Sequence, residues 1–311
     1  MLMFKMNTFS KAAVMAAFFC LNAAANAAQP KPTQIFFDDF SYADLPALTA
    51  KGWTPRSKAG HPGVPGAQWS AEQFSLHEDP QLKGNRVLRL SASTDGSSEG
   101  TRQAQLCHAR KYLEGTYAAR IRFTDVPVAG VDGDPVIQTF YAVTPLKHDF
   151  DPEFSEMDWE YLPNGGWGSE KTRLYGIAWQ TVQLEPWQAH NQQHEEFGSL
   201  NGWHELMMQV SDGRVKLFLD GRQIANHGGR TYPVTPMSIN FNLWFSPGGL
   251  LPKTEQARRY EQDVDWLFHA RNQVLNPKQV KAEVQRLRAK GIAQMDTVPA
   301  AEPALSSLCD F

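Results

Sequence analysis

Hydrophobic and polar residues alternate over a series of short runs along this chain. These runs are residues 86–91, 117–123, 136–143, 154–162, 174–180, 204–210, 215–219, 238–245 and 264–269. A period of two places apolar side chains on one face of a β-strand, so each run predicts a strand with one buried face. Asp212-Gly213 and Asp220-Gly221 stand between such runs and predict tight hairpin turns.

No amphipathic pattern of helix length interrupts these runs. Many strands joined by short turns favour an antiparallel sandwich or barrel over a βαβ fold. A helix is predicted only near the C-terminus, where Asn276-Pro277 starts it, Lys290 ends it and Gly291 follows. Its apolar residues recur at helical spacing at Val280, Val284 and Leu287. Residues 295–311 are rich in Ala and Pro and are expected to be irregular.

The composition is that of an ordinary globular protein, with 311 residues, 42% of them hydrophobic, and a formal net charge of -3. This near-neutral balance does not predict binding to nucleic acid or to an anionic membrane, and we expect a monomer. The chain has 9 Trp, 8 Tyr and 18 Phe residues, some of them in loops or on polar strand faces. Exposed rings suit the apolar C–H faces of sugars, although most rings in proteins pack in a core.

The N-terminus has the features of a secretory signal. Lys5 and Lys11 flank the start of an apolar run at residues 12–21, and Ala25-Asn-Ala27 supplies the small residues of a cleavage site. The run is shorter than the roughly 20 residues that a membrane span needs. We therefore expect residues 1–27 to be removed and the mature protein to be secreted or periplasmic, without a membrane span.

Two of the 3 cysteines, Cys107 and Cys309, follow the predicted signal. In an oxidising compartment a disulfide between them would fix the C-terminal tail to the main body of the protein. Two free thiols are the alternative, because spacing alone does not show that the cysteines meet.

The run 154–162 carries an unusual row of acids. Glu156, Asp158 and Glu160 share one face of the predicted strand, opposite Met, Trp and Tyr side chains. The Cα atoms of Glu156 and Glu160 would lie roughly 13 Å apart, and side chains that lean together approach the ~5–5.5 Å between carboxyls of a retaining glycosidase. Crowded acids cannot all ionise freely, so at least one pKa should be high. The alternative is an acidic strand that faces solvent.

Two other strands offer candidate sugar contacts. Asn240, Asn242 and Trp244 alternate with apolar residues, so their face is expected to point outward from the sheet. Arg173, Tyr175 and Trp179 likewise share a face of the strand that follows a glycine-rich loop, residues 163–168. Trp167 in that loop lies either at the edge of a cleft or in a simple turn. These residues form the predicted substrate-binding set.

Metal binding is a weaker hypothesis. His190 and His194 lie in a segment, residues 183–200, that we expect to be a polar loop, and their spacing would suit zinc only on a helix. Asp149, Asp151 and Glu153 lack the glycine and the later Glu of an EF-hand calcium loop. The sequence therefore predicts no metal ligands.

The segment Glu156-Met-Asp158-Trp-Glu160 resembles the Glu-x-Asp-x-Glu signature of glycoside hydrolase family 16. Other segments resemble the same family, namely residues 203–221 with their "DG" turn, Asn242-Leu-Trp244 and Val264-Asp-Trp266. The resemblance runs in patches from about residue 36 to residue 269. It implies an all-β, concanavalin A-like jelly-roll sandwich over residues 28–275, followed by a short C-terminal helix and irregular tail over residues 276–311.

The resemblance also implies a function. Glu156 would be the nucleophile and Glu160 the general acid/base of a secreted, retaining endo-β-glycosidase, with Asp158 hydrogen-bonded to Glu156. The substrate would be a β-glucan-type polysaccharide, and no cofactor would be needed, although the family allows a structural calcium ion. A transglycosylase and a non-catalytic carbohydrate-binding protein on the same fold are the alternatives. Trp159 departs from the family pattern, and we expect it to face the core.

Overall fold

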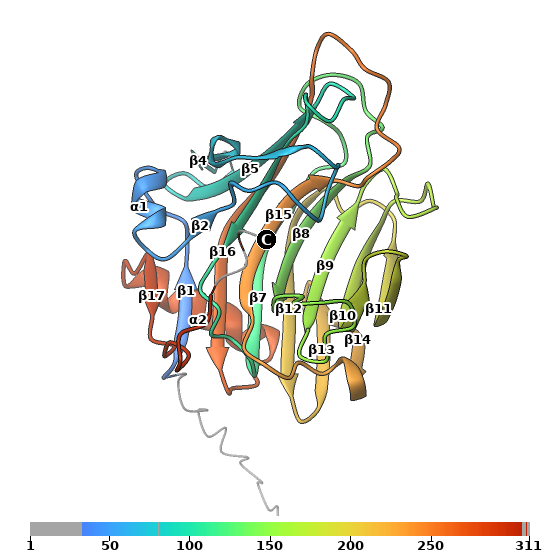
Figure 1. Cartoon of the computed structure of the whole chain (residues 1–311). Helices are drawn as coiled ribbons and strands as arrows, with labels where there is room; N and C mark the ends of the chain where they lie inside the picture. Colours follow the sequence, from blue (N-terminus) through green and yellow to red (C-terminus); the bar gives the residue numbers. More distant parts are fainter. Residues whose placement is uncertain (1–32, 80, 307–308, 310–311) are drawn as a thin grey trace, which may run out of the picture. The chain divides into compact units, whose positions relative to one another are not determined.

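The computed structural model describes residues 33–79, 81–306 and 309. The predicted signal, residues 1–27, lies outside the described residues. Two antiparallel β-sheets pack face to face over a large apolar core, so the predicted all-β sandwich is confirmed (Figure 1). We call the sheet that carries the row of acids sheet 1 and the sheet behind it sheet 2.

Sheet 1 contains the strands that position the candidate site. Their order across the sheet is β2 (Thr54–Pro55), β6 (Arg102–Cys107), β15 (Ser238–Phe245), β8 (Val136–Val143), β9 (Glu156–Leu162), β10 (Arg173–Gln183) and β11 (Gln188–Phe197). β9 lies between β8 and β10, and β11 is the last strand on that side among the described residues.

Sheet 2 lies behind sheet 1. Its strands, in order, are β4 (Phe74–Glu78), β5 (Arg86–Thr94), β16 (Arg258–Arg271), β7 (Gly115–Phe123), β12 (Gly202–Ser211), β13 (Arg214–Leu219) and β14 (Arg222–Gly228). β1 (Ile35–Asp38) pairs with the end of β16, and β17 (Gln294–Asp296) pairs with β1. β3 (Gln68–Trp69) runs parallel to the start of β6.

The predicted strands and turns are found in the structure. Each alternating run lies within a strand, except that β9 begins at Glu156, two residues after the start of the run 154–162; the apolar faces belong to the core between the sheets. Asp212 and Asp220 adopt left-handed conformations in the turns that join β12 to β13 and β13 to β14. Trp159 is fully buried and lies beside Gly176 of β10, whose missing side chain leaves room for Leu217 of β13, because a Cβ there would stand 2.7 Å from the leucine.

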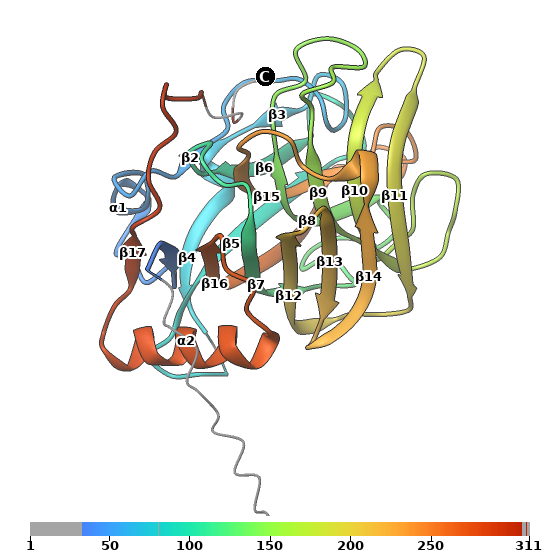
Figure 2. The ribbon, with the colours of Figure 1, turned by 90° about the horizontal axis from the view of Figure 1, so that it is seen from below.

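The predicted C-terminal helix is also present, as α2 (Pro277–Ala289). Asn276 caps it in a reciprocal hydrogen-bond pair with Gln279. Its buried face packs on β1 and β16 of sheet 2 through Val280 and Leu287 (Figure 2). No helix among the described residues is long and apolar enough to cross a membrane.

Two expectations about irregular segments were wrong. Residues 183–200 are not a loop, because β10 continues to Gln183 and β11 runs back as a hairpin strand. Residues 295–311 are not wholly irregular, because β17 pairs with β1. The sequence also gave no sign of the short helix α1 (Leu45–Thr49) or of the single turns η1 (Ala71–Gln73) and η2 (Gly229–Thr231).

Candidate active site

The row of acids lies on β9, in the middle of sheet 1 and on the face turned away from the core. Glu156 is opposite Trp179 of β10, and Glu160 is opposite Tyr175. The alternate residues of β9 belong to the core, so the pleat directs Glu156, Asp158 and Glu160 to the outer face. Asp158 is only 3% exposed. The sheet therefore holds these acids side by side in a poorly solvated position.

Burial raises the pKa of each acid in the row. The pKa of Asp158 lies well above its usual range, because burial and the charges of Glu156 and Glu160 all disfavour its ionised form. Burial also raises the pKa of Glu156, but a hydrogen bond from Asp158 opposes that rise. Burial and then the Glu156 charge raise the pKa of Glu160. The row therefore favours ionisation of Glu156, at one end, over ionisation of Asp158 and Glu160.

Trp179 fixes the middle of the row. Its indole Nε1 donates a hydrogen bond to Oδ2 of Asp158. Oδ1 of Asp158 has no partner of good hydrogen-bond geometry among the described residues, so the contact with Glu156 is the looser of the two. Trp179 in turn packs edge-on against Trp187, with ring centroids 6.1 Å apart. The indole thus holds the Asp158 carboxyl group in place beside Glu156.

The predicted contacts on β10 and its preceding loop are brought together. The Arg173 guanidinium bonds to Glu195 at 3.0 Å and to the carbonyl of Gly166 at 2.8 Å, and it lies over the Tyr175 ring. The Trp167 ring stands 5.3 Å from that of Tyr175 and is 48% exposed. Trp167 has a backbone φ of 48°, a left-handed conformation that residues other than glycine seldom adopt. The loop therefore presents an exposed aromatic ring beside Tyr175, the residue opposite Glu160, and the assignment of Trp167 to a cleft edge stays a prediction.

The predicted contacts on β15 are not open to solvent. Asn240, Asn242 and Trp244 do share the face of the acids, but they are 0%, 2% and 7% exposed. Asn242 accepts a hydrogen bond from the Tyr141 hydroxyl at 3.1 Å, and Asn240 donates to Ser238. The face of β15 therefore points outward from the sheet, as predicted, but it is not exposed, because another segment of the chain covers it.

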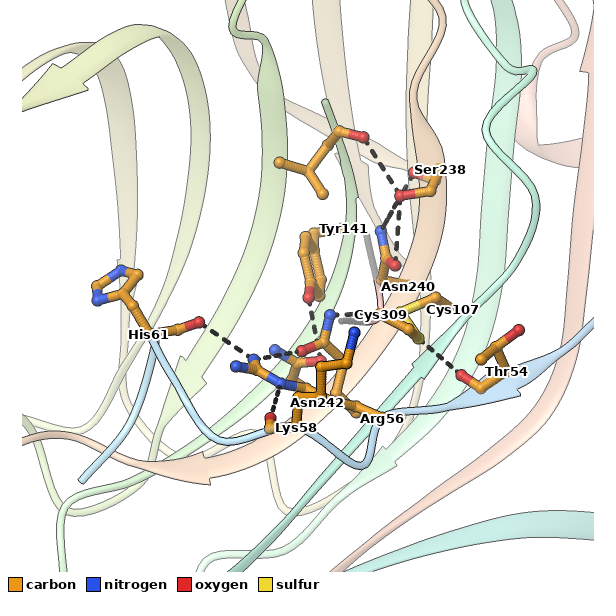
Figure 3. Close-up of a disulfide and its surroundings, with 12 residues drawn as sticks. Thr54, Arg56, Lys58, His61, Cys107, Tyr141, Ser238, Asn240, Asn242 and Cys309 are labelled. Atoms are coloured by element: carbon orange, nitrogen blue, oxygen red, sulfur yellow. Dashed lines mark hydrogen bonds between the residues drawn. A yellow bond between two sulfur atoms is a disulfide. The ribbon is translucent and has the colours of Figure 1, made fainter. Parts of the chain in front are cut away.

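The covering segment is residues 54–69, from β2 to β3. Arg56 is fully buried, and its guanidinium bonds to Gln105 at 2.9 Å and lies 4.3 Å over the Trp69 ring. Figure 3 shows Arg56 and Asn242 close to the disulfide of Cys107. Sequence reasoning missed Arg56, Trp69 and Tyr141, since only the turn-rich stretch around residues 60–66 marked this segment.

Cys107 and Cys309 form a disulfide in the structure, with Cα atoms 5.5 Å apart (Figure 3). Cys107 pairs with Asn240 on one side and with Thr54 on the other. The bond therefore fixes the C-terminal tail beside the segment that covers β15.

No candidate metal centre is found. Within the described ranges, no group of three or more His, Cys, Asp and Glu side chains is placed to hold an ion. His190 and His194 lie on strand β11, where a spacing of four residues separates the Cα atoms by roughly 13 Å. Asp151 accepts a hydrogen bond from the backbone of Glu153 at 2.9 Å. These residues therefore give no support for zinc or for a structural calcium ion.

Comparisons with known proteins agree with the fold. No family model and no curated protein sequence matches this chain. A β-glucanase from Bacillus licheniformis is 17% identical over 78% of this chain and 100% of its own, with a TM-score of 0.54. A family 16 endo-glucanase from Bacteroides ovatus is 15% identical over 75% and 98%, with a TM-score of 0.56. This is the fold of glycoside hydrolase family 16.

A third solved structure, a lichenase derived from a mouse hindgut metagenome, is 20% identical over 76% of this chain and 98% of its own, with a TM-score of 0.52. The expected jelly-roll resemblance is thus confirmed at the level of the fold. At such low identities the activity has to be argued from the residues of this chain.

Proposed function

We propose that this chain is an exported, retaining β-glycosidase that acts on a β-glucan-type polysaccharide. The observation that carries the proposal is the row of acids on β9, where burial raises each pKa and where Glu156 is the easiest to ionise. Retaining hydrolysis needs this combination of an ionised nucleophile and a protonated acid. The β-glucanases and endo-glucanases with the same fold support the substrate class, and the features of residues 1–27 support export.

The proposed reaction has two displacements at the same carbon. Glu156 attacks the anomeric carbon and forms an ester bond, while Glu160 gives its proton to the leaving glycosidic oxygen. Glu160, now ionised, takes a proton from water, whose oxygen bonds to the anomeric carbon and releases Glu156. Asp158 keeps its proton and directs it to Glu156. Trp179 holds Asp158 in place.

Product analysis by mass spectrometry tests this proposal. The mature protein, Glu156→Gln and Glu160→Gln are incubated separately with mixed-linkage glucan, laminarin, xyloglucan and agarose. Oligosaccharides from one polymer, lost in both variants, are expected; Lys278→Ala on α2 is the control and should release the same products as the parent. Larger products that require an acceptor sugar would instead indicate a transglycosylase.

The result that would contradict the proposal is binding without release. If the folded protein retained a polymer but produced no oligosaccharide, and Glu160→Gln bound it equally well, the carbohydrate-binding alternative would hold.

A further inference from the structure

Burial divides the outer face of sheet 1 into two unlike sides. Asn240, Asn242 and Trp244, on the β15 side of the acids, are almost fully buried. Aromatic rings on the β10–β11 side remain exposed, with Trp167 at 48% and Trp187 at 58%. A polysaccharide that ran across all the strands of sheet 1 would have to contact both sides of this face. Of the two sides, as far as the described residues show, the β10–β11 side is the one with free aromatic surface.

The cover over β15 is firmly attached. Arg56 donates hydrogen bonds to Gln105 and to the carbonyls of Lys58 and His61, at 2.9, 2.8 and 3.1 Å, so one buried side chain gathers the segment around itself. Its guanidinium also stacks on Trp69. A buried, multiply bonded cation of this kind is costly to displace.

Close packing and a covalent bond hold the same cover. Gly63 approaches Gln103 of β6 so closely that a Cβ would stand 2.4 Å from the amide nitrogen. Trp69 belongs to an apolar cluster with Trp244 and Ile137. The Cys107–Cys309 disulfide lies at the start of the cover, where Cys107 pairs with Thr54 of β2. The cover is therefore a fixed wall of the site.

The wall reaches across to the opposite rim. The His61 ring lies 6.4 Å from that of Trp187, at the tip of the β10–β11 hairpin. Trp187 packs on Trp179, which bonds to Asp158, so the chain of contacts runs from the wall to the acids. β15 is two strands from β9, so the cover begins roughly 10 Å from the row of acids.

We propose that the covering segment, residues 54–69, closes the site on the β15 side of the acids, so that the enzyme works from the end of a polysaccharide chain and releases short products. This inference rests on the proposed function. An internal bond is cut only when the polymer continues in both directions past the acids, and the wall leaves room for a chain end alone. Internal cleavage, which the family resemblance implies, is thus replaced by cleavage near an end.

The test compares the length of the polymer with the amount of short product. The mature protein is incubated with whichever of mixed-linkage glucan, laminarin, xyloglucan or agarose it cleaves. Residual chain length is followed by size-exclusion chromatography with light scattering, and new reducing ends are counted. Short oligosaccharides are expected while the residual polymer stays near its starting length. A polymer whose mean length halves before short products appear would overturn the inference and leave the glycosidase proposal standing.

Binding gives a second measurement that does not depend on turnover. Glu156→Gln is titrated with sized fractions of the same polymer by calorimetry. A chain-end site binds a constant number of protein molecules per chain, whatever the chain length. A number that rises in proportion to length would mean an open cleft. Absence of both binding and release with all four polymers would contradict the proposed function itself, and the inference would fall with it.

A double variant tests whether the contact between the wall and the β10–β11 hairpin determines where the polymer is cleaved. The double variant His61→Ala with Trp187→Ala removes the contact across the site but keeps the backbone carbonyl that binds Arg56. It is expected to make more internal cuts per short product than the parent. Lys278→Ala, far along the chain on α2, should behave like the parent. An unchanged ratio in the double variant would contradict closure of the site by this wall.

Discussion

Glu160→Gln is expected to abolish turnover and also to stabilise the folded protein at neutral and higher pH. Burial, and then the Glu156 charge, raises the pKa of Glu160 to about 8. The folded state therefore keeps a proton that the unfolded chain releases from about pH 4.3 upward. Stability is full below that pH and is lost as the pH rises towards the folded pKa.

The magnitude follows from the pKa. Each pKa unit corresponds to about 1.4 kcal/mol, so an isolated group with this pKa would cost about 4 kcal/mol at pH 7. Glu160 shares its site with a second acid and is partly exposed, which reduces the expected gain on substitution to about 2 kcal/mol. For a domain of this size such a gain raises the melting temperature by roughly 4–6 °C.

The assay is thermal unfolding followed by circular dichroism from pH 4 to pH 9. The difference in melting temperature between Glu160→Gln and the parent should be near zero at pH 4 and grow with pH. Glu72→Gln, at an exposed position, should show no such growth. A difference that is independent of pH, or a loss of stability at pH 8, would refute the burial argument.

Other consequences of the structure are open to measurement. Because burial raises the pKa of both Glu156 and Glu160, kcat/KM should fall as the pH drops below neutral and persist into the mildly alkaline range; a maximum near pH 4.5 would contradict this. Trp179→Phe keeps a ring but loses the donor to Asp158, so kcat should fall about tenfold with an unchanged circular dichroism spectrum. Asp265→Ala removes a buried carboxylate from the partly buried guanidinium groups of Arg120 and Arg288, and urea titration should show a loss in the free energy of unfolding of about 1–3 kcal/mol.

The sequence predicted the strands of the core because each has one apolar face. β11 escaped prediction because it is the end strand of its sheet and carries polar residues on both faces, so it shows no period of two. The row of acids was predicted for the same reason as the core strands, since the alternation of β9 fixes which side chains share a face. A local alternation of hydrophobic and polar residues predicts which side chains share a face when only one face of the strand is buried.

The cover over β15 was beyond the reach of such reasoning. The pairing of β2 with β6 joins residues about fifty positions apart, and β2 is only two residues long. Nothing in the alternation of Asn240, Asn242 and Trp244 tells whether solvent or another segment lies above them. Sequence pattern therefore located the candidate site but not its shape.

The pairing of the first strand with the last has a consequence for the order of folding. β1 pairs with β16 and β17, and Cys107 must wait for Cys309, 202 residues later, before its disulfide forms. A chain threaded through a membrane from its N-terminus would hold its opening strand unpaired until nearly everything else had emerged. A chain exported in this way would need its opening strand shielded until then, and an oxidant would have to act at the end of translocation.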